Sequence, residues 1–308
     1  MLRQVLIGLT LAAACIGTAS SQTDQRAAII AADPPFTPQN LVLGAPPRAV
    51  GPQVALFNGR DLNDWEGWLG YADPAKTYRN PPEAPLGRAG ADEMFKVVTE
   101  DGQPALYVNG KTWGALVHKG DYRNYHLRLD YKWGPGRWPP RVNLPPNNGL
   151  LYHSYGDQGA STGTWMYAVE FEIMQGSTGM VVRVGEGTRP HTTVGHDAAV
   201  AYPQRRFMLG GRDIEVVSPA WNVQHARDAE RPAGEWNTLD LYVLGDKAIH
   251  VVNGQPVMMV HGIETVDAAG KRTPLTHGRI QLQSEGAETY FRNIVLEPID
   301  RLPTVTAR

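Results

Sequence analysis

Short segments in which apolar and polar residues alternate occur through most of the chain. Because successive side chains of a strand point to opposite faces of a sheet, this alternation is typical of a strand with one buried face. We expect strands in the following segments: ALYVNG, LRLDYKW, GLLYHSY, AVEFEIM, GMVVRVG, TLDLYVLG, AIHVVNGQPVMMVHG, RIQLQS and TYFRNIVLEPI.

Helical periodicity is weak by comparison. No segment beyond the N-terminus has a sustained apolar repeat of about 3.6 residues, and the one helical turn that we expect lies near residues 61–65. The chain has 33 glycines and 24 prolines, which suit a fold with many turns. The pattern therefore predicts an all-β protein, built as a sandwich or a barrel of antiparallel strands.

One turn can be located from its residues. Asn253-Gly254 lies between two alternating runs in KAIHVVNGQPVMMV. This dipeptide is the preferred pair for a two-residue turn, because both residues adopt a positive φ at low cost. The sequence predicts a β-hairpin there.

The segment YAVEFEIMQGSTG places two acids on one face of an expected strand. Glu170 and Glu172 are two positions apart and share a face, whereas Val169, Phe171 and Ile173 share the other. A half-exposed strand gives the same pattern. The two glutamates are therefore either solvated or part of a polar site.

The N-terminus has the features of an export signal. Arg3 supplies a positive charge, and the apolar run at residues 5–17 is too short to span a bilayer. We expect residues 1–20 to be a signal peptide and the protein to be exported, to the periplasm or the extracellular space. Cys15 is the single cysteine, which rules out a disulfide within the chain and leaves a lipid anchor at this position open.

Composition divides the rest of the chain. Residues 21–52 are rich in proline and are expected to form a linker or an extended arm that lies on the domain. The alternating segments define a domain at residues 53–300, followed by a tail at residues 301–308. The formal net charge is −2 and no basic cluster is present, which argues against nucleic acid as a partner. No later apolar stretch is long enough for a membrane span.

From Leu56 onward, the chain resembles a bacterial family. The stretch LFNGRDLNDWEGW is similar to the start of the 3-keto-disaccharide hydrolase domain family, and further landmarks follow in the family's order over residues 54–299. These landmarks are GALVHKGDYRNYHLRLDYKWG, NNGLLYH, AVEFEIMQGSTG, GEWNTLDLYV, HVVNGQPV and GRIQLQSEGAETYFRNIVLEPI. The resemblance implies a concanavalin A-like jelly roll, a β-sandwich of two antiparallel sheets with a concave sugar-binding face.

Two departures from the family pattern concern loops. Family members usually read Arg-Asp-Ser-Gly where this chain has PNNG at residues 146–149. Acidic positions that often follow the central strand are Gln175, Ser177 and Met180 here. The second change puts in doubt any metal or acid role that this loop has in relatives.

The resemblance implies a carbohydrate substrate of the 3-keto-glycoside class. A ketone at C3 acidifies the hydrogen on C2, so a base can remove it while the group at C1 leaves, and water then adds to the unsaturated sugar. Such a site needs a base, a group that polarises the ketone, and an acid near the leaving oxygen.

Glu170, Glu172 and His153 are the catalytic candidates. We favour Glu170, because relatives often carry an amide at the position of Glu172. His153 is expected on a neighbouring strand, and an imidazole titrates near neutrality.

Six further residues are substrate-binding candidates, each for a stated chemical reason. A cationic side chain suits the ketone or the hydroxyls, a flat indole suits a sugar ring, and the polar residues near the end of RIQLQSEGAE suit a wet concave face. They are Lys119, Arg141, Tyr155, Trp165, Gln283 and Glu285. Tyr155 is expected to share the strand face of His153.

Two alternatives stay open. The spacing of Glu170 and Glu172 also suits a retaining glycoside hydrolase of the laminarinase type, although the third acidic position of such enzymes is Gln175 here. A non-catalytic, lectin-like carbohydrate-binding domain is the other alternative. No cofactor is assigned; a divalent metal is left open without ligands, and the oligomeric state is not predicted.

Overall fold

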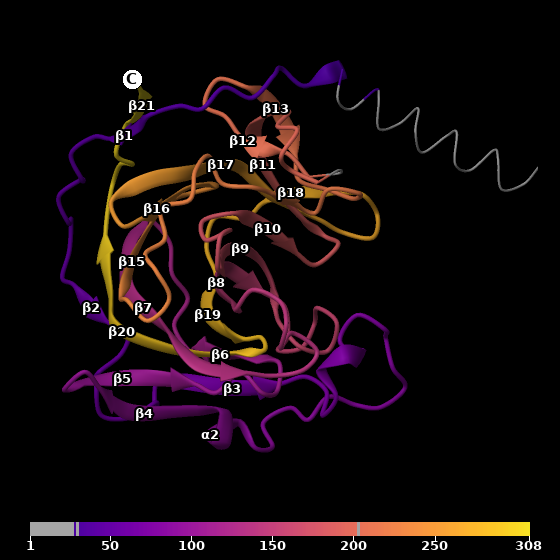
Figure 1. Cartoon of the computed structure of the whole chain (residues 1–308), viewed down its shortest axis with the longest axis vertical. Coiled ribbons are helices and arrows are strands. Elements are labelled where there is room, and N and C mark those ends of the chain that lie inside the picture. The colour runs from indigo at the N-terminus through magenta and orange to yellow at the C-terminus, as the bar shows by residue number, and fades with distance from the viewer. Residues whose placement is uncertain (1–27, 29–30, 202–203) are drawn as a thin grey trace, which may run out of the picture.

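The computed structural model describes residues 28, 31–201 and 204–308. The expected signal peptide and Cys15 lie outside the described residues. The described part is almost entirely β-structure, and two large antiparallel sheets are stacked face to face (Figure 1). This is the concanavalin A-like jelly-roll β-sandwich that the resemblance implies.

The smaller sheet has seven strands. In spatial order they are β14 (Asn222–Val223), β10 (Val181–Val184), β9 (Tyr167–Met174), β8 (Asn147–Tyr155), β19 (Arg279–Ser284), β6 (Gly114–His118) and β3 (Trp65–Leu69).

The larger sheet has twelve strands and curves around the smaller one (Figure 1). Its main path is β12 (Arg206–Phe207), β11 (Thr188–Gly195), β17 (Gln255–Val266), β16 (Lys247–Val252), β15 (Asn237–Leu244), β7 (Tyr125–Arg137), β20 (Ala287–Pro298), β5 (Gln103–Val108) and β4 (Phe95–Glu100). Three short strands pair at its margins: β13 (Arg212–Glu215) with β11, β18 (Arg272–Pro274) with β17, and β2 (Val54–Ala55) with β20.

The alternation on β9 explains how the sheets pack. Val169, Phe171 and Ile173 are fully buried in the core between the two sheets. Glu170 and Glu172 therefore project from the opposite, concave face of the smaller sheet. Each large apolar side chain that faces the core stabilises the sandwich by about 1.5–3 kcal/mol.

Each segment that we expected to be a strand coincides with a strand or a strand pair, and the predicted hairpin is confirmed. Asn253 and Gly254 connect β16 to β17 with φ angles of 49° and 79°. The helical turn expected at residues 61–65 is wrong, because this segment is a turn that leads directly into β3. The described helices lie elsewhere and are short: η1 (Pro74–Lys76) and α2 (Ala91–Met94).

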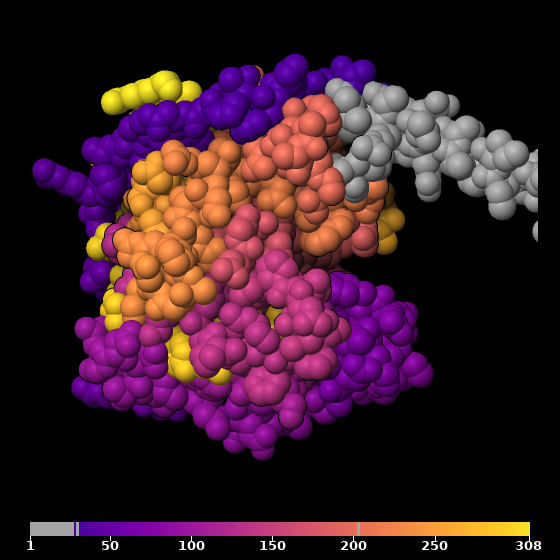
Figure 2. Space-filling view, in the orientation of Figure 1, coloured from indigo at the N-terminus to yellow at the C-terminus, as the bar shows by residue number. Residues whose placement is uncertain are grey.

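The proline-rich arm lies on the outer surface of the domain (Figure 2). Its strand β1 (Leu41–Leu43) pairs with β21 (Val305–Ala307), so the arm and the C-terminal tail form a two-stranded sheet. The buried Asp33 carboxylate binds Arg205 and Arg212, with a distance of 2.6 Å from each Nε. Among the described residues, no helix has the length and apolar character to cross a membrane.

Candidate functional site

A cleft of about 820 Å³ lies over the concave face of the smaller sheet. Strands β8, β9, β10 and β19 form its floor, and the loops around residues 78, 141, 161 and 221 contribute its walls. The molecule is visibly hollowed between the loop at residues 70–90 and the segment near residue 220 (Figure 2).

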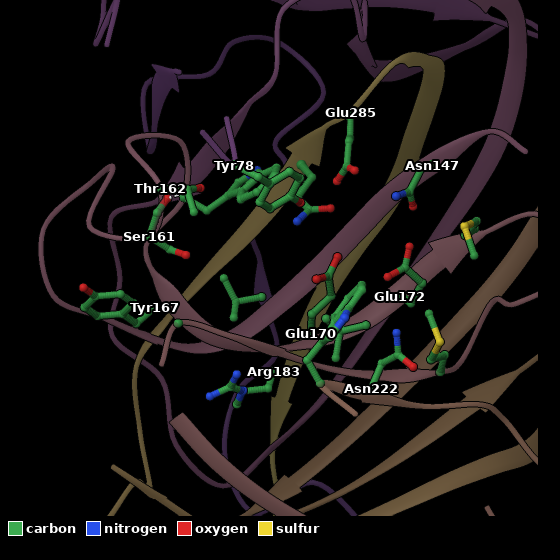
Figure 3. Close-up of a pocket in the computed structure, with 18 of the residues that line it drawn as sticks. Tyr78, Asn147, Ser161, Thr162, Tyr167, Glu170, Glu172, Arg183, Asn222 and Glu285 are labelled. Atoms are coloured by element: carbon green, nitrogen blue, oxygen red, sulfur yellow. Dashed lines mark hydrogen bonds between the residues drawn. The ribbon is translucent and has the colours of Figure 1, made fainter. Parts of the chain in front are cut away.

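Three carboxyl groups point into the same part of this cleft (Figure 3). Glu170 and Glu172 come from β9, and Glu285 comes from the turn between β19 and β20. All three are buried. Placing three acids together away from water strongly disfavours their full ionisation, because burial and mutual repulsion both oppose the charged form.

The pKa values of these groups reflect that environment. Burial raises the pKa of Glu170 and of Glu172 well above the ordinary range, and repulsion from neighbouring carboxylates adds to the effect. Burial also raises the pKa of Glu285, to about 7, but the guanidinium of Arg141 and the side chain of Asn147 oppose this increase. Glu285 is therefore the carboxyl group that titrates near neutral pH.

Arg141 is the cation closest to the three acids. Its Nη1 lies 3.7 Å from Oε1 of Glu285. Its backbone is held by a turn in which the N–H of Arg141 donates to the carbonyl of Trp138, at 2.9 Å. Gly286 makes room for it, since a Cβ on this residue, which has φ +82°, would lie 3.0 Å from Cβ of Arg141.

Gly149 has a similar role beside Glu170. A Cβ at Gly149 would lie 2.0 Å from Oε1 of Glu170 and 2.5 Å from Oε1 of Gln283. Both side chains lie across the bare backbone of β8 at this point. The glycine in the sequence NNG therefore provides the space that the Glu170 carboxyl occupies.

The cleft is rich in hydrogen-bond acceptors that have no donor within the described residues. They are Oδ1 of Asn147, Oε1 of Glu172, Oδ1 of Asn222 and Oε1 of Gln283, and each is buried. A buried polar atom without a partner costs roughly 1–3 kcal/mol. The site is therefore suited to a ligand that brings several O–H donors, or to a cation.

Aromatic side chains form two walls of the cleft. On one side, Tyr78 and Trp165 line the cleft with their ring centroids 6.1 Å apart. Trp113, which is not a lining residue, stacks on Trp165 at 6.2 Å and lies 6.1 Å from Tyr78. The side chain of Tyr78 is 68% exposed. Trp221, which is 50% exposed, lines another part of the cleft. Exposed rings beside a polar floor suit the apolar face of a sugar ring.

The structure brings six of the nine predicted residues together in the cleft. They are Glu170, Glu172, Arg141, Trp165, Gln283 and Glu285. Sequence reasoning missed Tyr78, Asn147, Tyr167, Arg183 and Asn222, which also line it. The sequence did contain a feature that pointed to Asn147, because this residue lies in the PNNG segment that departs from the family pattern. No sequence feature pointed to Tyr78, because it lies in an irregular loop.

His153 is not part of the cleft, which corrects its prediction as a catalytic residue. Strict alternation on β8 would place it on the same face as Glu170. Instead, the register of β8 against β9 shifts between Tyr152 and Tyr155, and His153 has a φ of 51°. Its ring is fully buried, with Nε2 3.0 Å from the carbonyl of Gly245, and burial lowers its pKa to about 4.

Lys119 and Tyr155 are also outside the cleft lining, contrary to prediction. Nζ of Lys119 donates to the carbonyl of Asn63, at 2.7 Å, at the end of β6. The hydroxyl of Tyr155 is 3.0 Å from that of Thr188, and its ring packs against the core. The same shift in β8 that displaces His153 changes the direction of Tyr155.

The cleft does not gather a compact metal-ligand set. In the part of the chain that the structure describes, one group of His, Cys, Asp or Glu side chains brings three ligand atoms within 4.8 Å of one another, and that group lies outside the cleft. Glu172, Glu285 and the amide oxygen of Asn147 would be the oxygen ligands if a hard cation bound here.

Several solved structures are similar to this chain at low sequence identity. A candidate glycosyl hydrolase from Parabacteroides distasonis ATCC 8503 is 17% identical, with a TM-score of 0.45 over 80% of this chain and 94% of that chain. A Bacillus subtilis protein of unknown function with a galectin-like fold is 11% identical, with a TM-score of 0.44 over 84% and 100%. The β-glucanase of Bacillus licheniformis is 12% identical, with a TM-score of 0.41 over 82% and 100%.

No curated protein sequence matches the chain. A family model does match, and it covers most of the described domain: it is the model of the 3-keto-alpha-glucoside-1,2-lyase-like domain, which aligns with residues 52–297. Both large sheets, apart from the last residue of β20, and all three glutamates of the cleft lie within these bounds. The chain therefore belongs to the 3-keto-alpha-glucoside-1,2-lyase-like family.

Proposed function

We propose that this protein is an exported carbohydrate-active enzyme that cleaves the glycosidic bond of 3-keto-glycosides by elimination followed by hydration. The observation that carries the proposal is the buried Glu285 carboxyl, which lies beside Arg141 in an acceptor-rich cleft. Family membership supports the substrate class.

Glu285 is the proposed base. A general base works best when its pKa is near the working pH, and the pKa of Glu285 is about 7. Its carboxylate takes the hydrogen from C2 of the sugar, and the electron pair of the broken C–H bond forms the enolate of the C3 ketone. Arg141, adjacent to Glu285, stabilises the negative charge that develops on the ketone oxygen.

Glu170 is the proposed acid. Its raised pKa keeps it protonated at neutral pH, so that it can donate a proton to the glycosidic oxygen. The C1–O bond breaks as the C1=C2 bond forms, which releases the aglycone as an alcohol. Water then adds to C1 and gives one proton to the Glu170 carboxylate, while C2 regains a proton from Glu285. Both carboxyl groups return to their starting states, and the net reaction is hydrolysis.

The remaining cleft residues bind the sugar in this proposal. Sugar hydroxyls supply the donors that the oxygens of Asn147, Asn222 and Gln283 lack. Tyr78 and Trp165 offer flat surfaces for the ring. A retaining glycosidase is less well supported, because Gln175 is exposed outside the cleft lining and Met174 faces the cleft in its place.

The proposal is tested with two matched chromogenic α-glucosides, one oxidised at C3 and one not. We expect cleavage of the oxidised sugar and exchange of its C2 hydrogen with solvent deuterium. Glu285→Gln should abolish both, whereas Glu235→Gln, on the exposed surface, should abolish neither.

Two results would contradict the proposal. Cleavage of the unoxidised sugar at a similar rate would indicate ordinary glycosidase chemistry by the paired glutamates. Binding of sugars without turnover of either substrate would indicate a lectin-like domain, a function that the exposed Tyr78 and Trp221 rings would also serve.

A further inference from the structure

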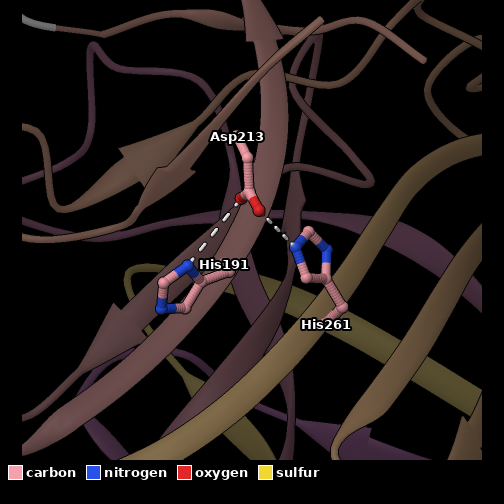
Figure 4. A group of neighbouring side chains, drawn as sticks. All are labelled: His191, Asp213 and His261. Atoms are coloured by element: carbon pink, nitrogen blue, oxygen red, sulfur yellow. Dashed lines mark hydrogen bonds and ion pairs between the residues drawn. The ribbon is translucent and has the colours of Figure 1, made fainter. Parts of the chain in front are cut away.

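Two histidines and an aspartate meet on the larger sheet, outside the cleft lining (Figure 4). His191 lies on β11, Asp213 on β13 and His261 on β17. One ligand atom from each lies within 4.8 Å of the other two.

Strand pairing explains why these side chains converge. His191 and His261 are direct partners across the antiparallel pair β11–β17. Asp213 is the partner of Thr193, which is two residues from His191 and so points to the same face. Three neighbouring strands therefore each contribute one side chain to one patch of the sheet surface, and the rigid backbone of the sheet fixes their relative positions.

The distances are close to those of a metal site. Nε2 of His261 is 3.1 Å from Oδ2 of Asp213, and Nδ1 of His191 is 3.8 Å from Oδ1. Ligands at about 2.0–2.1 Å from a tetrahedral zinc ion are separated by about 3.3 Å. Small rotations of these partly exposed side chains would bring all three to coordination distance.

The charges around the group leave Asp213 available as a ligand. Glu215, two residues further along β13, is neutralised by Arg189 and Arg272, at 3.1 Å and 3.0 Å. Within the described residues, Asp213 has no lysine or arginine in ion-pair distance, and its contacts are the two imidazoles.

We propose that His191, Asp213 and His261 form a binding site for one divalent ion of the Zn²⁺ type, with water as the fourth ligand. Two imidazoles and one carboxylate suit zinc, nickel and copper rather than calcium or magnesium. The ion joins β13, β11 and β17, so it stabilises the margin of the larger sheet and has no part in the cleft chemistry.

The test uses the full-length mature chain without a histidine tag, after removal of metals with a chelator. Calorimetric titration with ZnCl₂ should give one equivalent bound, and Co²⁺ should give the visible absorption of a tetrahedral site. His261→Ala and Asp213→Ala should each weaken zinc binding by at least about tenfold, in line with loss of one ligand. Zinc should also raise the melting temperature of the wild type more than that of either variant.

His277→Ala is the matched control. His277 contacts Asp121 at 2.9 Å on the exposed surface, so it makes the same kind of pair without a third ligand. This variant should bind zinc as the wild type does. The absence of zinc binding by the wild type, or equal binding by His261→Ala, would overturn the proposal and leave the group as a His–Asp ion pair. Because no substrate is involved, the result is independent of the proposed enzymatic function.

Discussion

The chemistry of the cleft depends on two opposing influences on the pKa of one residue, Glu285. Burial disfavours its charge, whereas Arg141 and Asn147 favour it. Arg141 also lowers the pKa of Glu170 and of Glu172, but burial and repulsion from neighbouring carboxylates outweigh it and favour the neutral forms of both. Three similar carboxyl groups thus obtain different protonation states from their surroundings.

This balance predicts the pH profile of kcat/KM for the oxidised glucoside. Because a base must be deprotonated, the rate should rise as pH increases through about 7 and should be lost at lower pH. At higher pH the rate should fall again as the Glu170 acid loses its proton. Arg141→Met should shift the acidic limb to higher pH, since Arg141 lowers the pKa of Glu285; an unshifted limb would contradict the assignment of Glu285.

For Glu172 we predict an effect on the stability of the protein rather than on the rate of cleavage. Burial and the neighbouring Glu285 raise its folded-state pKa well above the ordinary value of 4.5, so the native state holds a proton that the unfolded state releases as pH rises above that value. The wild type should therefore lose stability from about pH 5 upward. Glu172→Gln should therefore raise the free energy of unfolding at pH 8, because it removes the buried ionisable group.

Urea unfolding at pH 4 and pH 8 measures this difference. At pH 4 the variant and the wild type should be nearly equal, because the carboxyl is protonated in both states. The exposed Glu235→Gln should change neither value by more than about 0.5 kcal/mol. If Glu172→Gln is less stable than the wild type at pH 8, the negative charge of Glu172 is stabilised by neighbouring groups in the native state, which would contradict the prediction.

At the scale of elements, strand register decides which side chains reach the cleft. β9 keeps strict alternation, so both of its glutamates face the cleft and its apolar residues face the core. β8 does not, and the shift between Tyr152 and Tyr155 turns His153 into the interior. A displacement of one residue reverses the face of every following side chain.

The β16–β17 hairpin offers a test at this scale. Gly254→Val places a β-branched residue at a φ of 79°, which should destabilise the protein by about 1–2 kcal/mol. Gly254→Asn is the matched control and should cost less, because asparagine tolerates a positive φ. Chemical denaturation compares them; equal losses would mean that backbone strain is not the cause.

In the molecule as a whole, the described part of the arm is joined to the C-terminal tail by strand pairing and to the sandwich by charge. The arm that begins before β1 carries Asp33, whose carboxylate lies between Arg205 and Arg212. The tail strand β21 pairs with β1. The arm thus contacts both the tail and the β12–β13 region of the larger sheet.

Asp33→Asn should therefore loosen the arm. Removal of one partner from a buried ionic group is strongly destabilising, and we expect a loss of about 3 kcal/mol together with faster proteolysis at residues 34–50. Asp300→Asn, in the exposed pair with Arg301, should change stability by less than about 1 kcal/mol. If the arm of Asp33→Asn resists protease as in the wild type, backbone pairing alone holds it.

The fold class, the main strands, the Asn253-Gly254 turn and the acidic face of β9 could be predicted from the sequence. These features depend on local patterns, namely alternation, turn propensity and family landmarks. Six of the nine predicted site residues lie in the cleft, because they occupy strands with regular alternation or the loops that immediately adjoin them.

The other features of the two sites depend on tertiary contacts. The register shift in β8 turns His153 away from the cleft, and an irregular loop places Tyr78 in the cleft wall. Three different strands bring His191, Asp213 and His261 together. The pKa order of the three glutamates likewise depends on burial and on Arg141, which approaches Glu285 from a different loop. Such arrangements arise from contacts between distant segments, and no local pattern encodes them.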